Sequence, residues 1–354
     1  MIETKEREVP GRSKGGTSNI CQETNVKKML MCFVHATALF ACALYAQEKT
    51  DSSPHTIQFV AVDKDVKLEV LDWGGTGRPL VFLAGLGNTA HIFDGFATKF
   101  TASHHVYGIT RRGFGASSKP VPANDNYAAD RLGDDVLAVL DALKLDHPVL
   151  AGHSLAGEEL SSIGSRRPER VAGLIYLEAG YGYAYYDAAH GDIIFDFFQL
   201  KKRLDDFMSG KVRDQRQFAQ GLSVNVSQFD KDLQEAMRRD ASVPGLHAPP
   251  VEVPSIIAAI NLGAQRYGDI PVPVLAIFAC PHNFDSIPAF RDNPRAKAEM
   301  VAHDLVMTTR QADAFQAGIP SAHVVRIPDA SHYAFNSNEA EVVREMNRFL
   351  EKLR

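Results

Sequence analysis

The hexapeptide GHSLAG at residues 152–157 is the part of this chain best suited to chemistry. It directly follows the apolar run PVLA at residues 148–151, where a buried strand is expected to end. A serine between small residues, on a sharp turn from a strand into a helix, exposes its hydroxyl as a nucleophile. The pattern therefore predicts a nucleophilic Ser154, although its strict form has glycine where this chain has Ala156.

The elements expected around Ser154 alternate between strands and helices. Two-residue alternation at 57–62 and 67–73 predicts an antiparallel opening pair. Short apolar runs, typical of strands buried on both faces of a parallel sheet, lie at 80–84, 106–109, 149–151, 174–177, 272–279 and 324–327. Helical patterns separate them at 89–101, 128–144, 155–167, 294–317 and 338–353. This order predicts the α/β class, with a doubly wound, mostly parallel sheet and helices on both faces.

About 90 residues without strand character separate the run ending at Leu177 from the run beginning near Val272. They contain helical patterns at 193–208, 212–221 and 228–240, followed by a proline-rich stretch at 244–254. Because so long a loop is rarely structureless, we expect a helical cap inserted between the sixth and seventh strands, over the carboxyl edge of the sheet. The predicted organisation is a leader at 1–47, a first core segment at 48–180, the cap at 181–270 and a second core segment at 271–354.

Four motifs, in this order along the chain, resemble those of the α/β-hydrolase superfamily. They are LAGLGN at 83–88, RRGFGAS at 111–117, the turn around Ser154 and DASH at 329–332. The resemblance extends from about Ile57 to the C-terminus, and it implies an α/β-hydrolase sheet with a serine nucleophile. In the second motif, the glycines are expected at positions that need unusual backbone angles.

A serine hydroxyl needs a base, and that base needs an orienting group. The resemblance implies His332 as the base, because it follows the last strand and stands after the nucleophile in chain order. Most relatives carry the acid a few residues past the strand at 272–279, where this chain first offers Asp285. One branch of the haloalkane dehalogenases instead uses a glutamate at the preceding strand tip, which corresponds to Glu178. A carboxylate that ends an apolar strand is costly to bury unless it is paired, which favours Glu178, but Asp285 remains an alternative.

Two backbone N–H groups are expected to form the oxyanion hole, those of Leu86 and Leu155. Relatives usually carry histidine where this chain has Ala84, but a backbone donor does not depend on that side chain. Tyr181 and Tyr183 open the cap and are candidates for binding the substrate. Packing between the cap and the sheet is the alternative for these tyrosines, and packing is also the role expected for His153.

Net charge and the spacing of motif residues argue against several other function classes. The chain has 354 residues and a net charge of −5, without a basic stripe, so nucleic acid is not an expected partner. His282 and His303 lack partners at the spacing of metal ligands, and no metal is expected. The pair Gly85 and Gly87 is not followed by the third glycine of a dinucleotide fingerprint. We therefore expect no cofactor and no stable protein partner.

The N-terminal segment resembles a signal for export. Lys27 and Lys28 precede an apolar segment at 29–46 that ends in small residues, which predicts a signal peptide at about 27–46 and a periplasmic or extracellular protein. An uncleaved membrane anchor, or a lipid anchor at Cys42, is the alternative. Cleavage would leave Cys280 as the one cysteine and would exclude internal disulfides.

Together these features predict a serine hydrolase that cleaves a small-molecule ester through an acyl-enzyme intermediate. Haloalkane dehalogenases and epoxide hydrolases use an aspartate nucleophile, so Ser154 argues against both chemistries. Hydrolysis of another bond on the same framework (a carbon–carbon bond, a lactone or an amide) stays open. The alternative from a different class is a ligand-binding or signalling protein with slow turnover.

Overall fold

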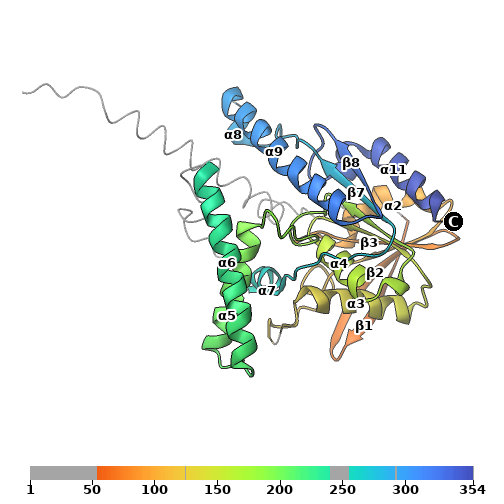
Figure 1. Cartoon of the computed structure of the whole chain (residues 1–354). Helices are drawn as coiled ribbons and strands as arrows, with labels where there is room; N and C mark the ends of the chain where they lie inside the picture. Colours follow the sequence, from red (N-terminus) through yellow and green to blue (C-terminus); the bar gives the residue numbers. More distant parts are fainter. Residues whose placement is uncertain (1–53, 124, 240–254, 292, 354) are drawn as a thin grey trace, which may run out of the picture.

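A computed structural model describes residues 54–123, 125–239, 255–291 and 293–353. Its centre is an eight-stranded sheet in the order β1-β2-β4-β3-β5-β6-β7-β8 (Figure 1). Strand β2 pairs antiparallel with β1 and β4, and the remaining pairs are parallel. The strands are β1 (Thr56–Asp63), β2 (Val66–Gly74), β3 (Pro79–Leu83), β4 (His105–Ile109), β5 (Val149–His153), β6 (Gly173–Leu177), β7 (Val274–Ala279) and β8 (Ala322–Ile327). The predicted α/β class and its mostly parallel sheet are confirmed.

Alternate residues of the central strands enter two separate cores, one on each face of the sheet, because successive strand side chains point to opposite faces. On one face, Leu150, Leu174 and Val274 pack in a cluster with side chains of α3 (Ala129–Ala142), α4 (Ala156–Arg166) and α9 (Pro294–Gly318). On the other face, Val149, Ile175 and Leu275 pack with the helical segments after β3 and with α11 (Glu339–Lys352). Helices therefore cover both faces, as expected of a doubly wound sheet.

The remaining helical segments are short or belong to the insertion. They are η2 (Ala90–Phe93), α2 (Asp94–Ala97), η3 (Thr98–Phe100), η4 (Pro168–Arg170), α5 (Ile193–Met208), α6 (Gln215–Arg239), α7 (Ser255–Gly263), α8 (Pro288–Arg291) and α10 (Ala334–Ser337). Helices α5, α6 and α7 lie between β6 and β7 in the chain, where the insertion was predicted.

Two helix predictions were wrong in detail. The pattern at 89–101 forms three short segments instead of one helix, and the hydroxyls of Thr98 and Thr101 donate to the carbonyls of Gly95 and Thr98. Such side-chain bonds compete with a regular α-helical ladder. Where two helices were predicted at 212–221 and 228–240, the structure has the single helix α6.

A contact with α5 supports the middle of α6. Asn225, which is 3% exposed, accepts a hydrogen bond of 2.9 Å from Nε of Arg203. The two helices run side by side in Figure 1.

Helix α7, for which no pattern was assigned, brings the insertion onto the sheet edge. Ile257 and Ile260 pack in one apolar cluster with Leu86, after β3, and Leu155, after β5. The leader predicted at 1–47 and the proline-rich stretch at 244–254 lie outside the described residues. No helix in the described ranges is long and apolar enough to cross a membrane.

Candidate active site

Ser154 lies on the turn between β5 and α4, with a φ of 52°. Left-handed backbone costs energy in a residue with a side chain, and such strain is concentrated at functional sites. A Cβ on Gly157 would lie 2.0 Å from the carbonyl oxygen of Ala179, so only glycine lets α4 approach the chain after β6. A Cβ on Gly152 would lie 3.0 Å from the Cβ of Ala156. Glycine at 152, two residues before Ser154, therefore leaves room for alanine at 156, two residues after Ser154.

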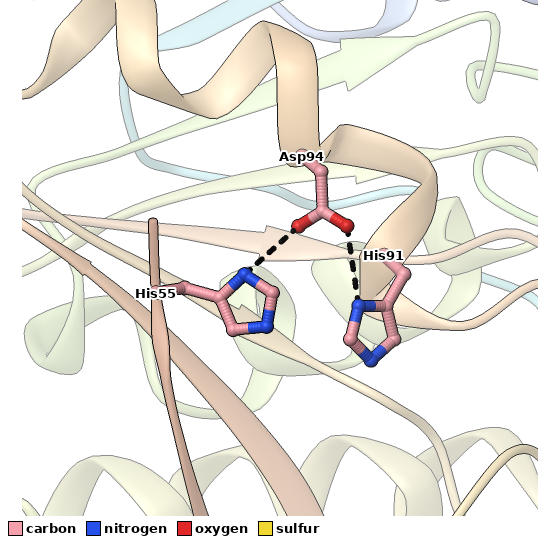
Figure 2. Close-up of side chains that lie close together, drawn as sticks. All are labelled: His55, His91 and Asp94. Carbon is pink, nitrogen blue, oxygen red and sulfur yellow. Dashed lines mark hydrogen bonds and ion pairs between the residues drawn. The ribbon is translucent and has the colours of Figure 1, made fainter. Parts of the chain in front are cut away.

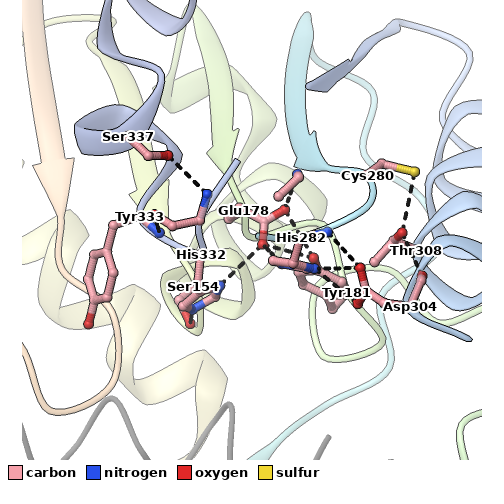
Figure 3. A network of polar contacts seen from close by, with 12 residues as sticks. Ser154, Glu178, Tyr181, Cys280, His282, Asp304, Thr308, His332, Tyr333 and Ser337 are labelled. Carbon is pink, nitrogen blue, oxygen red and sulfur yellow. Dashed lines mark hydrogen bonds and ion pairs between the residues drawn. The ribbon is translucent and has the colours of Figure 1, made fainter. Parts of the chain in front are cut away.

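His332 brings an imidazole to this turn from the loop between β8 and α10. Its Nε2 lies 2.9 Å from Oγ of Ser154 (Figure 3). The loop is held in place because the N–H of Ser331 donates to Oγ of Ser337, and His153 donates through Nε2 to the carbonyl oxygen of His332. Burial lowers the pKa of His153 to about 3, so this second histidine is neutral and packs beneath the first.

Glu178, at the end of β6, faces the other nitrogen of His332 at a distance of 3.2 Å between Nδ1 and Oε2. Its side chain is fully buried, and the N–H of Ala279 and the hydroxyl of Tyr181 also donate to it. Burial raises the pKa of Glu178, but the charge and hydrogen bonds of His282 and His332 outweigh that effect and lower it. The carboxylate is therefore ionised beside His332.

The structure does not bring Asp285 to His332. Its side chain is 68% exposed and pairs with Lys297 at the surface. The side chain near Glu178 after β7 belongs instead to His282, for which the sequence predicted no metal-ligand partner and no role in the site. Nε2 of His282 lies 2.6 Å from Oε2 of Glu178, and its Nδ1 lies 3.0 Å from Oδ1 of Asp304 on α9.

His282 carries a positive charge. Burial lowers the pKa of His282, but the facing carboxylates of Glu178 and Asp304 raise it, and the balance is about 10. Ser154, His332, Glu178, His282 and Asp304 thus form one chain of contacts, which we call the Glu178 network (Figure 3). Sequence reasoning missed His282 and Asp304, because no local pattern links two residues 22 positions apart on different elements.

The N–H groups of Leu86 and Leu155 are near Ser154. Leu155 is the residue before α4, and Leu86 follows Gly85, whose Cβ would lie 3.1 Å from Cβ of Ser154. Within the described part of the chain, neither N–H donates a hydrogen bond to a protein acceptor. Two such donors beside a nucleophile are able to bind an oxyanion.

The two candidate tyrosines differ. The hydroxyl of Tyr181 lies 3.0 and 2.9 Å from the two carboxylate oxygens of Glu178, so this residue supports the acid, and its contact with substrate stays a prediction. The hydroxyl of Tyr183 is buried and faces the Ser154 hydroxyl, but it makes no hydrogen bond of ordinary geometry among the described residues. Its ring packs against the cluster that contains Leu86 and Leu155. Burial raises the pKa of Tyr183 well above its usual value, so the phenol is neutral.

Two pairs of buried charges follow β4, in the RRGFGAS motif. Arg111 donates to both oxygens of Glu159, at 2.6 and 2.9 Å, and Arg112 donates to both oxygens of Asp135. We call these four residues the arginine cluster. Gly113, with a φ of 90°, lets the chain turn between this cluster and α7, and a Cβ there would lie 2.9 Å from the side chain of Ile256.

Outside the site, His55, His91 and Asp94 place possible metal-ligand atoms within 4.8 Å of one another (Figure 2). Nδ1 of His55 lies 3.4 Å from Asp94 and Nδ1 of His91 lies 3.2 Å from it, while the indole N–H of Trp73 donates to the same carboxylate. Possible ligand atoms of Glu178, His282 and His332 also lie within 4.8 Å of one another. Here both histidines are at hydrogen-bond distance from the carboxylate of Glu178.

A family model described as alpha/beta hydrolase fold matches residues 78–339. Among curated proteins, the 3-oxoadipate enol-lactonase 2 of Acinetobacter baylyi is 33% identical over 108 residues, which are 30% of this chain and 39% of that protein. The fluoroacetate dehalogenase of a Burkholderia species is 29% identical over 107 residues, 30% of this chain and 35% of its own. The chain thus spans half or less of the length of the first curated relatives it matches.

Solved structures show the same fold at low identity. A thermophilic esterase from Thermogutta terrifontis is 18% identical, with a TM-score of 0.51, and the match covers 85% of this chain and 99% of the esterase. A serine hydrolase involved in carbazole degradation is 17% identical, with a TM-score of 0.52, and the match covers 85% of this chain and all of that one.

Proposed function

Since this chain belongs to the alpha/beta hydrolase fold family, we propose that it is a serine hydrolase that cleaves a small-molecule ester. The observation that carries the proposal is the distance of 2.9 Å between Oγ of Ser154 and Nε2 of His332. An imidazole at hydrogen-bond distance is what a weakly nucleophilic hydroxyl requires for activation.

The first half-reaction forms an acyl-enzyme. Oγ of Ser154 attacks the ester carbonyl carbon while its proton moves to Nε2 of His332. The negative oxygen of the tetrahedral intermediate accepts hydrogen bonds from the N–H groups of Leu86 and Leu155. The intermediate then expels the alcohol, whose oxygen takes the proton from His332, and the acyl group remains on Ser154.

The second half-reaction restores the enzyme. Water attacks the acyl carbon and gives one proton to His332, and collapse of the second intermediate returns that proton to Ser154 as the carboxylic acid leaves. Glu178 accepts the hydrogen bond from Nδ1 of His332, which orients the ring and stabilises the imidazolium formed at each step. Its lowered pKa keeps Glu178 ionised throughout neutral pH.

The surroundings of Ser154 favour a small acyl group. Leu86, Leu155 and Ile257 pack closely over the turn, and the ring of Tyr183 packs against them. The buried hydroxyl of Tyr183 faces Ser154 without a hydrogen bond of ordinary geometry among the described residues, and it is a donor that a polar atom of the substrate could use. The related enol-lactonase and the esterase of the same fold act on ester bonds by their names, which is consistent with this substrate class.

The test combines a covalent probe with turnover. We expect a fluorophosphonate to label Ser154 in the purified protein, and we expect p-nitrophenyl acetate and butyrate to be hydrolysed. Ser154→Ala should lose both labelling and turnover, with a fall in kcat of about 10⁶-fold where background permits its measurement. Turnover in the Ser154→Ala variant equal to that of the wild type would disprove the proposal. Labelling without hydrolysis of any ester or lactone would favour the slow-turnover binding protein instead.

A further inference from the structure

We propose that His282, held by Asp304, is a positioning residue that acts through Glu178 to orient His332 and to extend activity toward lower pH. This inference rests on the proposed hydrolase function. It assigns a role to two buried side chains that the reaction steps above do not use.

The contacts of His282 leave its ring no freedom. Asp304 accepts from both the backbone N–H of His282, at 2.7 Å, and its Nδ1, at 3.0 Å. The opposite nitrogen, Nε2, donates to Glu178 at 2.6 Å. A protonated imidazole is the side chain that can donate to two carboxylates on opposite sides at once.

Glu178 is bound more closely by His282 than by His332. The bond from His282 is 2.6 Å long, whereas the bond from His332 to the same oxygen, Oε2, is 3.2 Å long. The other oxygen, Oε1, accepts from the N–H of Ala279 and the hydroxyl of Tyr181. The carboxylate is thus fixed by donors other than His332, so its position does not depend on the ring that must take up and release protons.

The charge of His282 also bears on His332. The two rings lie 6.3 Å apart between centroids, with Glu178 bonded to both. The positive charge of His282 repels a proton on His332 across the shared carboxylate, since like charges at this distance repel through a medium of low dielectric constant. This repulsion opposes the attraction of Glu178 for the same proton.

The groups that face His282 come from three directions. Glu178 lies at the end of β6, with the Tyr181 hydroxyl bonded to it, and Asp304 lies on α9. His332 lies on the loop after β8, and Phe284 contributes a ring 6.2 Å away. Among these described neighbours, the two carboxylates of Glu178 and Asp304 face the one imidazolium of His282, and the proton that His332 gains during the reaction balances the second negative charge.

The experiment measures reactivity against pH, in variants of His282 and Asp304. We would follow the rate of Ser154 labelling by a fluorophosphonate, and kcat/KM for p-nitrophenyl acetate, from pH 5 to pH 9. His282→Gln keeps an amide donor but removes the charge, and Asp304→Asn keeps an acceptor for the backbone N–H of His282. His105→Gln is the matched control, because it removes another histidine–aspartate pair, with Asp72, at the amino end of β4.

For His282→Gln we expect kcat/KM at pH 8 to fall about 10-fold and the midpoint of the acid limb to rise by about one pH unit. Asp304→Asn should shift the midpoint in the same direction by less, and His105→Gln should leave both quantities unchanged. A variant that loses activity equally at every pH, with the midpoint unmoved, would show that His282 only fills space, and unchanged activity would also overturn the proposal.

The two proposals fail in different ways. If the wild type is labelled and hydrolyses esters but the His282→Gln profile matches it, the positioning role alone is disproved. If the wild type is neither labelled nor active at any pH, the proposed function is disproved, and the inference that rests on it is disproved too. Circular dichroism and thermal unfolding of each variant separate misfolding from a change in reactivity, and Asp304→Asn provides the second test if His282→Gln does not fold.

Discussion

The Glu178 network and the arginine cluster are two sets of buried charges on one sheet, and they are built from different cations. In the arginine cluster, each guanidinium donates to both oxygens of one carboxylate, and Arg112 is 1% exposed. In the Glu178 network, one carboxylate accepts from two imidazoles. Arginine stays charged at any pH that proteins tolerate, whereas an imidazole donates a proton in its charged form and accepts one in its neutral form.

This difference separates a structural role from a chemical one. The arginine cluster joins the turn after β4 to α3 and α4. Its guanidinium groups do not release protons, so they cannot take part in proton transfer. The Glu178 network ends at Ser154 with a nitrogen that can move a proton. Breaking the first should therefore change stability, while breaking the second should change reactivity.

Glu178→Gln should produce the largest effect. Its amide NH₂ would face two imidazole N–H donors, and the ring of His332 would lose its acceptor. We expect kcat/KM for p-nitrophenyl acetate to fall by about 10³- to 10⁴-fold, as for the loss of the acid in other serine triads. The control is an unchanged circular dichroism spectrum, and activity within 10-fold of the wild type would remove Glu178 from the catalytic machinery.

Asp135→Ala should destabilise the fold, because it leaves the buried guanidinium of Arg112 without its carboxylate. Removing one partner of a buried ion pair typically costs about 3–5 kcal/mol. Urea unfolding of the variant and the wild type measures this difference in the free energy of unfolding. At temperatures where the variant stays folded, kcat should remain within a few-fold of the wild type. A stable variant with strongly reduced kcat would contradict the separation between the two sets of charges.

The charge of His282 predicts how stability depends on pH. Folding raises the pKa of His282 from its ordinary value of 6.5 to about 10. The stabilisation is therefore complete below about pH 6.5 and is lost as the pH rises toward 10. We expect the Tm of the wild type to fall from pH 7 to pH 10 more than that of His282→Gln. Parallel Tm curves for the two proteins would show that this histidine is not charged in the folded state.

Asp285→Asn should have the smallest effect. The carboxylate is exposed at the surface and pairs with Lys297, and exposed pairs of this kind contribute little. We expect kcat/KM within twofold of the wild type and a Tm within about 1 °C. A loss of activity of 100-fold would mean that the segment after β7 rearranges to bring Asp285 to His332, which would reverse the comparison with Glu178.

Residue patterns were informative where the physical requirement is local. The turn at Ser154 needs small neighbours, because a side chain at 157 would meet the backbone of Ala179 and one at 152 would crowd Ala156 of α4. Strands buried on both faces are short apolar runs, because the side chains on both of their faces pack in the core. The single helix α6 was not predicted, and its middle contacts Arg203 of another helix, which no local pattern could indicate. The contact of Tyr181 with Glu178 was not predicted, because this hydrogen-bond partner could not be inferred from its neighbours in the chain.

The choice between Glu178 and Asp285 shows where such reasoning ends. Each follows a buried strand, and each is a carboxylate with a plausible place near the carboxyl edge. Steric demands and side-chain periodicity act over a few residues, so the order of amino acids was enough to predict the strands and the turn at Ser154, while His332 was implied by the resemblance to the α/β-hydrolase superfamily. Glu178 faces the imidazole of His332 because β6 and β7 lie in parallel register, which places the N–H of Ala279 beside Glu178. Its position also depends on Asp304 of α9, which holds His282 against it. These are contacts between distant segments, and they exist only once the sheet and its helices have packed.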